Sequence, residues 1–305
     1  MVQKNSLNKL LIICGPTASG KTALAVECAK ILDTEVISAD SMNVYRGLNV
    51  GTAKPDDAEK DGVVHHLIDV ASPFEKFSVG DYKEKAEPIV KDLIKNNKIP
   101  IICGGTGFYI NSLIYDFSYG NSSGNMEVRK KYTSLAEEKG AEYVYSILQS
   151  LDPDSASKIH CNDFKRVVRA LEIYSSGTKK SDIKDSFVPK INYKAVSFDF
   201  PRDELYNRID RRVDEMIKNG LTEEVRGLKN QGVTLNNQCM QGIGYKEIYL
   251  YLDGEYTLSE AIEKIKLNTR HYAKRQITFF KKLPGIEYLV PGNVKTIAEK
   301  ITGEI

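Results

Sequence analysis

Residues 10–29 read Leu-Leu-Ile-Ile-Cys, then Gly15-Pro16-Thr17-Ala18-Ser19-Gly20-Lys21-Thr22, then Ala-Leu-Ala-Val-Glu-Cys-Ala. This order predicts a short apolar strand, a glycine-rich loop and a helix. In the pattern G-x-x-x-x-G-K-[ST], the glycines let backbone N–H groups surround an anion, the lysine adds a positive charge, and the last hydroxyl can ligate Mg²⁺. The chain is therefore expected to bind a phosphorylated ligand, which need not be ATP.

The sequence that follows this loop predicts an α/β core. Strand-like apolar runs at Leu10–Cys14, Glu35–Ser38 and Pro100–Cys103 alternate with helical patterns. This alternation is typical of a parallel sheet with helices on both faces, in which ligands bind beyond the carboxyl ends of the strands. We therefore expect a P-loop NTPase-like fold.

A helical insertion is expected to interrupt this core. The polar stretch Gly120–Asn125 breaks the alternation, and helical periods follow at Glu127–Lys139, Ala141–Ser150 and Asp163–Tyr174. Tyr193–Phe200 again resembles a core strand, and the chain is expected to be helical from Arg202 onward. The predicted domains are a core of residues 1–117 and 191–305 and an insertion of residues 118–190.

Composition points to an ordinary globular protein. The chain has 305 residues, of which 41% are hydrophobic and 28% charged, and no apolar run is long enough to span a membrane. Its five cysteines are scattered and form no CxxC pair. This usage argues for a reducing cytoplasm and against a disulfide framework or a structural zinc site.

Charge is unevenly distributed although the net charge is only +2. The segment Lys264–Lys282 carries seven Lys or Arg and no Asp or Glu, with Tyr272, Phe279 and Phe280 among them. A basic helix of this kind suits a nucleic-acid backbone. A solvated face is the alternative, and for the basic run alone we favour it.

Other polar residues follow predicted strands or lie on predicted helices. Asp40, after the second strand, suits a Mg²⁺ ligand, a general base or a cap for the next turn. The turn Gly104-Gly105-Thr106-Gly107 would let its backbone approach a ligand. His65 and His66 are adjacent and would point to opposite faces of a strand, which favours packing over metal binding. Charged residues recur at helical spacing after Arg202, and most of them are expected to form solvated ion pairs. The alternative is that one of the arginines reaches into a phosphate site.

Taken together, these motifs resemble the tRNA dimethylallyltransferase family in its bacterial form. The resemblance covers essentially the whole chain and rests on the order of the following motifs: Gly15–Thr22, Asp40–Gly47, Gly51–Pro55, His65–Asp69, Gly104–Gly107, Lys165–Glu172, Gln241–Lys246 and Thr269–Thr278.

The resemblance implies transfer of a dimethylallyl group from dimethylallyl diphosphate to the exocyclic amine of the adenosine 3′-adjacent to the anticodon in tRNA. The loop Gly15–Thr22 would bind the donor's diphosphate or a nucleotide, with Mg²⁺ as cofactor at Thr22. Asp40 would accept the proton of the attacking amine. The other implied catalytic residues are Thr17, Lys21, Arg208 and Arg212.

The resemblance also implies a tRNA-binding surface, and the insertion would grip the anticodon arm. The chain is expected to act as a monomer. The implied tRNA-binding residues are Asp40, Ser41, Met42, Asn43, Thr106, Arg129, Lys165, Arg166, Val167, Val168, Arg169, Gln241, Gly242, Ile243, Gly244, Tyr245, Lys246, Lys274, Arg275, Gln276, Ile277, Thr278, Phe279, Phe280 and Lys281.

Two positions depart from the family pattern. Asn43 replaces the common glutamine, and Cys161 replaces a usual proline.

Three other activities use similar motifs: a small-molecule or nucleotide kinase, prenylation of free adenine nucleotides, and RNA binding without catalysis. The helical insertion and the basic segment argue against the first two, because a small acceptor needs neither.

Overall fold

The structure is a computed structural model that describes residues 9–117, 125–183 and 186–305. It divides the chain into two compact units. Unit 1 comprises Met1–Ile114 and Lys190–Ile305, and unit 2 comprises Tyr115–Pro189. The predicted break at Gly120 lies outside the described residues.

Unit 1 contains a six-stranded sheet with the order β3-β2-β4-β1-β7-β8, and every pairing in it is parallel. The strands are buried apolar runs for the most part, as expected when helices cover both faces. This confirms the α/β fold class. The strands are β1 (Lys9–Cys14), β2 (Val36–Ser38), β3 (His65–His66), β4 (Ile101–Gly104), β7 (Asn192–Phe198) and β8 (Ile286–Leu289).

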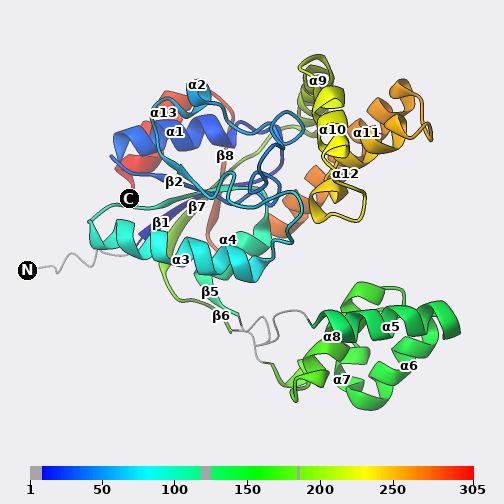
Figure 1. Cartoon of the computed structure of the whole chain (residues 1–305). Helices are drawn as coiled ribbons and strands as arrows, with labels where there is room; N and C mark the ends of the chain where they lie inside the picture. Colours follow the sequence, from blue (N-terminus) through cyan, green and yellow to red (C-terminus); the bar gives the residue numbers. More distant parts are fainter. Residues whose placement is uncertain (1–8, 118–124, 184–185) are drawn as a thin grey trace, which may run out of the picture. The chain divides into compact units, whose positions relative to one another are not determined.

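Helices cover both faces of this sheet. Helices α1 (Lys21–Ile31) and α13 (Val294–Gly303) lie on one face, and α3 (Val79–Lys95) and α4 (Gly107–Ile114) lie on the other (Figure 1). On the α1 side, Leu24 and Cys28 pack against Leu11 and Ile13 of β1. A short helix, α2 (Asp57–Lys60), lies between β2 and β3.

A group of helices follows β7 in the sequence: α9 (Arg202–Lys218), α10 (Leu221–Asn230), α11 (Tyr245–Leu252) and α12 (Leu258–Phe280). Leu205 and Ile209 of α9 pack against Ala273 of α12. The expectation that the chain is helical from Arg202 onward is wrong at β8. That strand is only four residues long and has a polar residue at its centre, so it gives no apolar run.

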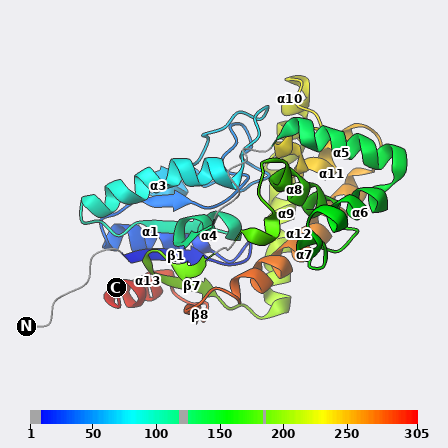
Figure 2. The ribbon, with the colours of Figure 1, turned by 90° about the horizontal axis from the view of Figure 1, so that it is seen from below.

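Unit 2 is a small helical body built from α5 (Met126–Lys139), α6 (Ala141–Leu151), α7 (Pro153–Ala156) and α8 (Phe164–Ser175) (Figure 2). Buried Val144, Leu148, Val167 and Leu171 form its own core. The unit begins at β5 (Tyr115–Asp116) and ends at β6 (Ser186–Pro189), which pair antiparallel. Two 3₁₀ turns, Lys180–Asp182 here and Gln238–Gln241 in unit 1, complete the regular structure.

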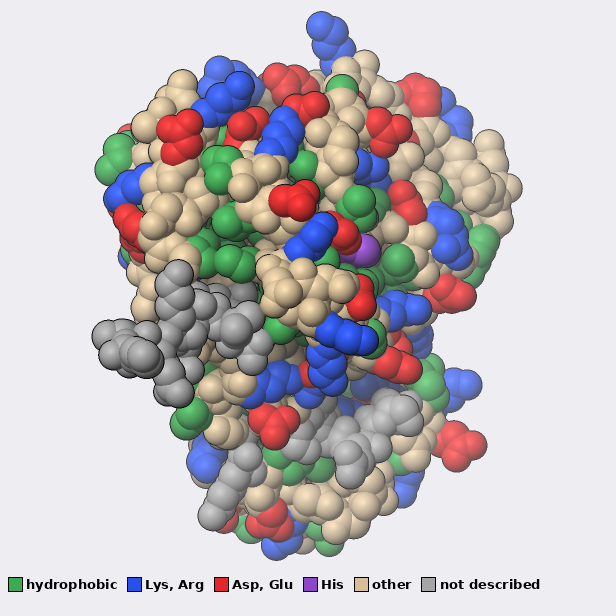
Figure 3. Space-filling view, turned by 90° about the vertical axis from the view of Figure 1, so that its left-hand side faces the viewer, with side chains coloured by type: hydrophobic (Ala, Val, Ile, Leu, Met, Phe, Trp, Pro, Cys, Tyr) green, Lys and Arg blue, Asp and Glu red, His purple; other side chains and the backbone are tan. Residues whose placement is uncertain are grey.

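The face of the molecule that lies on the left in Figure 1 carries charges of both signs. Lys and Arg side chains alternate there with Asp and Glu side chains (Figure 3). Among the described residues, no helix combines the length and the hydrophobicity needed to cross a membrane.

Candidate active site

The phosphate loop joins β1 to α1 at the carboxyl edge of the sheet. Gly15 has φ 128° and Gly20 has φ 84°, in the left-handed range that glycine tolerates best. A Cβ on Gly15 would also lie 2.4 Å from Ser197 Oγ. Because Gly20 is the N-cap of α1 and has no capping side chain, the first N–H groups of α1 are left for an anion.

Lys21 is held inside this loop. Its Nζ donates to the Pro16 carbonyl at 2.5 Å, and Ser19 Oγ donates to the same carbonyl at 2.8 Å. Burial lowers the pKa of Lys21 to about 8. A bound anion would favour the protonated lysine and raise this pKa again.

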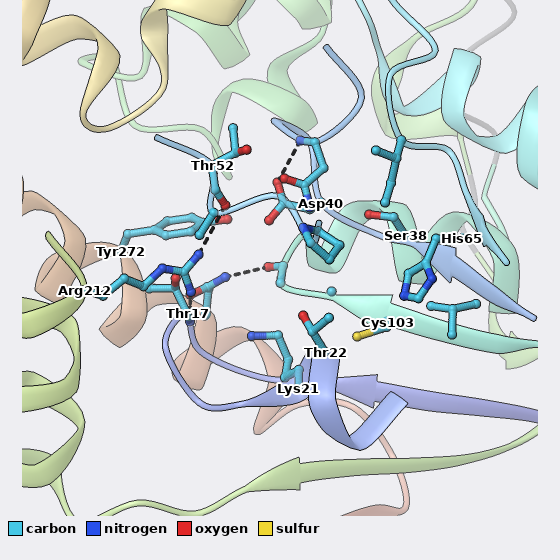
Figure 4. Close-up of a pocket in the computed structure, with 18 residues that line it drawn as sticks. Thr17, Lys21, Thr22, Ser38, Asp40, Thr52, His65, Cys103, Arg212 and Tyr272 are labelled. Atoms are coloured by element: carbon cyan, nitrogen blue, oxygen red, sulfur yellow. Dashed lines mark hydrogen bonds between the residues drawn. The ribbon is translucent and has the colours of Figure 1, made fainter. Parts of the chain in front are cut away.

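Three cavities adjoin the loop and share lining residues, and Figure 4 shows the smallest of the three. An inner cavity of about 100 Å³ is lined by Lys21, Thr22 and Asp40. An arginine-lined cavity of about 500 Å³ meets it at Lys21 and Thr22. The third, of about 350 Å³, contains Asp40 and several apolar side chains. We call these the inner, arginine and acceptor cavities.

Asp40 lines both the inner and the acceptor cavity. Its Oδ1 accepts hydrogen bonds from the backbone N–H of Met42 at 2.8 Å and of Asn43 at 3.4 Å (Figure 4). The cap role considered from the sequence is therefore present. It leaves the second carboxylate oxygen for chemistry, so the cap and base roles are compatible.

Two arginines of α9 reach the phosphate loop. Arg208 donates through Nε to the Ala18 carbonyl at 2.8 Å, and Arg212 donates to the Thr52 carbonyl at 3.2 Å. Arg212 lines all three cavities, and its Nε has no partner among the described residues. Burial lowers the Arg212 pKa, which the charge of Asp40 partly opposes. Arg212 is thus a half-buried cation whose buried Nε–H is available to a ligand.

The loop that carries Thr52 is fixed from α10. The Glu224 carboxylate accepts from the backbone N–H groups of Asn49, Val50 and Gly51 at 2.9, 2.8 and 3.2 Å. Glu224 also accepts from the Tyr245 hydroxyl at 2.5 Å. These contacts hold the carbonyl that orients Arg212.

The second glycine turn packs closely against its neighbours, and Gly104 and Gly105 also line the inner cavity. A Cβ on Gly104 would lie 2.2 Å from the Ala39 carbonyl oxygen. On Gly105 it would lie 2.0 Å from Gln276 Nε2, and on Gly107 2.1 Å from Phe279. The turn lies directly between the Asp40 loop and α12. Thr106 Oγ1 accepts from the Ser41 N–H at 3.0 Å and so orients the Asp40 loop.

A magnesium ion fits this site only together with a ligand's own oxygens. The described residues contain no group of three or more His, Cys, Asp or Glu that could hold a metal. The inner cavity offers the hydroxyl of Thr22 and the carboxylate of Asp40, and Mg²⁺ commonly pairs one or two such protein ligands with phosphate oxygens. His66 instead bonds Glu35 at 2.5 Å, and His65 bonds the Val63 carbonyl at 2.9 Å.

Several residues predicted to bind tRNA do not present their side chains. Gln276 is 5% exposed and its amide bonds to the protein backbone, and Tyr245 donates to Glu224. Tyr245 and Gln276 still line the acceptor and inner cavities, so the assignment of these residues to tRNA binding stays a prediction. The buried set is Val167, Val168, Tyr245, Gln276 and Phe280.

The basic segment of α12 divides into two halves. Lys266 pairs with Asp214 at 2.8 Å, and Arg270 pairs with Asp210 at 2.8 Å. Farther along, the described residues provide no ion-pair partner for Lys274, Arg275 or Lys281, whose side chains are exposed. These three side chains are available to an external anion.

In unit 2, a buried carboxylate organises two predicted tRNA-binding arginines. Glu172 is fully buried and accepts from Arg129 Nε at 2.7 Å and from a second Arg129 nitrogen at 3.1 Å. Arg169 donates to the same carboxylate at 3.2 Å. Lys165 and Arg166 are exposed on the same helix, α8, as Arg169.

The structure adds site residues that sequence reasoning missed. Tyr272 of α12 lines the inner and acceptor cavities, and burial together with the charge of Asp40 raises its pKa to about 12. Arg211 lines the arginine cavity, and Met216 the acceptor cavity. Tyr272 lies within the Thr269–Thr278 motif, which was the available signal, whereas Met216 belongs to no motif.

The family model described as IPP transferase matches residues 43–283. The tRNA dimethylallyltransferase of Acetivibrio thermocellus is 45% identical over 93% of this chain and 92% of its own length. The enzyme of the same name from Alkaliphilus oremlandii is 47% identical over 92% of this chain and 90% of its own.

Solved structures agree with these matches. The full-length tRNA isopentenylpyrophosphate transferase from Bacillus halodurans has a TM-score of 0.73 at 39% identity, covering 97% of this chain and 96% of that one. A eukaryotic dimethylallyltransferase acting on tRNA has a TM-score of 0.82 at 28% identity, covering 97% of this chain and 77% of that one. With a family model, close relatives and solved folds all matching along its length, the chain belongs to the IPP transferase family of tRNA dimethylallyltransferases.

Proposed function

We propose that this chain transfers a dimethylallyl group from dimethylallyl diphosphate to the exocyclic amine of the adenosine 3′-adjacent to the anticodon in tRNA, releasing diphosphate. One observation carries the proposal. Two half-buried cations, Lys21 of the phosphate loop and Arg212 of α9, line a cavity that also contains the carboxylate of Asp40. Diphosphate binding and proton removal are therefore possible at neighbouring points.

The phosphate loop and α9 would bind the donor's diphosphate. The N–H groups at the start of α1, the Lys21 ammonium and the Arg208 and Arg212 guanidiniums lie around the inner and arginine cavities. Negative charge grows on the diphosphate as the carbon–oxygen bond breaks. Fixed donors in a buried site stabilise that charge more in the transition state than in the ground state.

Thr22, which lines the inner cavity, is the residue that would hold Mg²⁺ together with the diphosphate oxygens, which leaves the free oxygen of Asp40 for proton removal. When bound, the ion would neutralise charge on the diphosphate oxygens. Thr17 lines the same cavity and would orient the diphosphate.

Asp40 would act as the general base for the adenine amine. An adenine amine is a weak nucleophile, so removal of its proton as the new bond forms would assist attack. Tyr272 lies beside Asp40 and is a neutral phenol that can donate a hydrogen bond, and burial raises its pKa further above the ordinary value.

The acceptor cavity would receive the dimethylallyl group and the adenine. Its lining includes Met42, Ile209, Val213, Met216 and Ile243, which give it an apolar side. The target base must leave the anticodon stack to enter it, as in other enzymes that act on a nucleobase.

Exposed residues of both units would bind the rest of the anticodon arm, with unit 2 gripping the stem-loop. We assign this role to the exposed members of the predicted set, chiefly Lys246, Lys274, Arg275 and Lys281 in unit 1 and Lys165 and Arg166 in unit 2. We further propose that the enzyme works as a monomer in the cytoplasm.

Labelled dimethylallyl diphosphate, incubated with unmodified tRNA, tests the proposal. We expect label in the tRNA, lost when the adenosine beside the anticodon is replaced. Label in AMP alone would indicate prenylation of free nucleotides, phosphate transfer from ATP would indicate a kinase, and RNA binding without turnover would indicate a non-catalytic protein. Each of these three results contradicts the proposal.

A further inference from the structure

Gln276 of α12 joins two loops that are far apart in the sequence. Its Oε1 accepts from the backbone N–H of Thr17 at 2.9 Å, and its Nε2 donates to the Gly105 carbonyl at 3.0 Å. The side chain is 5% exposed. One amide therefore connects the phosphate loop, the second glycine turn and α12.

The surroundings are shaped to fit this amide. A Cβ on Gly105 would lie 2.0 Å from Gln276 Nε2 and 3.4 Å from the Gly15 carbonyl oxygen. Only glycine lets the turn, the amide and the phosphate loop come this close together. Gly107 likewise has no side chain that would clash with Phe279, which lies about one helical turn beyond Gln276 on α12.

This contact fixes the phosphate loop at its least supported point. On one side of Thr17, the Pro16 carbonyl is held by Lys21 and Ser19. On the other side, the Ala18 carbonyl is held by Arg208. The Thr17 N–H is held by Gln276 and not by a group of the loop itself. Without the amide, this partly buried donor would lack a partner, or the loop would shift to find one.

We propose that Gln276 is a positioning residue for the donor site, one that sets the conformation of the phosphate loop through the Thr17 N–H and is not a contact for tRNA. This inference rests on the proposed function, since it concerns the site that holds the donor's diphosphate. The family resemblance implies that Gln276 binds tRNA together with its neighbours on α12, whereas the proposal gives Gln276 a role at the donor site.

Two substitutions separate its hydrogen bonds. Gln276→Met keeps the length of the side chain and loses both bonds, whereas Gln276→Glu keeps an acceptor for Thr17 and loses the donor to Gly105. For Gln276→Met we expect the KM for dimethylallyl diphosphate and the Kd for inorganic pyrophosphate to rise about ten-fold, the loss expected for a hydrogen bond of this kind. The KM for tRNA stays within about two-fold of its original value, since the amide contacts only protein. Gln276→Glu places a negative charge against the Gly105 carbonyl oxygen and beside the diphosphate site, so we expect it to weaken donor binding at least as much as Gln276→Met does.

Asn268→Leu is the matched control. Asn268 lies on the same helix and donates to Glu247 at 2.8 Å, and neither residue lines any of the three cavities. We expect its loss to lower the melting temperature and to leave both donor constants unchanged.

Two results would overturn the inference. A higher KM for tRNA with an unchanged donor KM in Gln276→Met would make Gln276 an RNA contact. An equal donor defect in Asn268→Leu, at an equal loss of melting temperature, would make its role one of general stability. Pyrophosphate binding needs no turnover, so it tests Gln276 even if the protein transfers no prenyl group, which would refute the proposed function alone.

Discussion

At the scale of single residues, the site depends on side chains that do two things at once. Asp40 caps its own turn through one oxygen and lines two cavities. Lys21 stays inside the loop through a bond to Pro16 and also supplies its charge. Such double roles let a ligand-free site keep its shape, because each functional group already has a partner in the protein.

The two roles of Asp40 can be separated by substitution. Asp40→Asn keeps the oxygen that accepts from the Met42 N–H and removes the base, so we expect kcat to fall by about 10²- to 10⁴-fold with an unchanged melting temperature. Asp40→Ala removes the cap as well and should cost about 1 kcal/mol of stability in addition. Both variants should bind tRNA as the unaltered protein does. Near-normal turnover by Asp40→Asn would remove this carboxylate as the base.

Lys21 predicts how donor binding depends on pH. Its pKa in the free protein is about 8, and a bound diphosphate raises it. Below that pH the lysine is already charged, so its contribution to binding is complete. As the pH rises above about 8, binding must first take up a proton, and the affinity should fall by up to about ten-fold per pH unit.

Calorimetric titration with dimethylallyl diphosphate across this pH range measures the effect. Lys21→Arg is the control, because a guanidinium keeps its charge throughout while the ligand's own titration is common to both proteins. Equal pH profiles in the two proteins would contradict the assignment of this titration to Lys21.

At the scale of elements, different side chains of α12 have three different surroundings. One stretch bonds to acids of α9 through Lys266 and Arg270, and Tyr272 and Gln276 face the donor site. Lys274, Arg275 and Lys281 remain exposed. The sequence predicted a basic helix but not this division, because the neutralising Asp210 and Asp214 come from a helix about 60 residues earlier.

The division predicts different salt dependences for two lysines on this helix. Lys274→Ala should weaken tRNA binding and reduce the slope of log affinity against log salt by about one, the value for one lost phosphate contact. Lys266→Ala, the matched control, removes a lysine already paired with Asp214 and should leave the slope unchanged. Filter binding over a salt series measures both, and equal slopes in the two variants would return α12 to the solvated-face interpretation.

At the scale of the whole molecule, alternating apolar runs sufficed to predict the fold class and four of the parallel strands. The strands absent from the prediction are β5, β6 and β8. Unlike β2 and β4, which are equally short but wholly buried, they contain exposed or half-buried polar residues and give no apolar run. The loop Gly15–Thr22 and Asp40 were assigned from motifs with a chemical meaning. At Gly104, Gly105 and Gly107 the sequence could not reveal the close packing against Ala39, Gln276 and Phe279, because close packing and ligand approach both require a missing side chain.

The separation into units predicts separable defects in binding. Lys165→Ala combined with Arg166→Ala, both exposed on α8 of unit 2, should weaken tRNA binding by about ten-fold or more, as expected when two phosphate contacts are lost. The Kd for dimethylallyl diphosphate should not change, because the donor's ligands all lie in unit 1. Equilibrium binding of each substrate tests this, and a parallel loss of both affinities would show that unit 2 contributes to the donor site.

The paired strands β5 and β6 bear on how the chain folds. They hold the two ends of unit 2 next to each other, and in unit 1 the Lys190 N–H donates to the Ile114 carbonyl at 2.9 Å. Once unit 2 has formed around its own core, it connects the two segments of unit 1 as a tight turn would, because its two ends lie next to each other. Folding of unit 2 then covers the entropic cost of closing the long loop. As a result, pairing of β7 with β1 should be faster than it would be across an unfolded insertion.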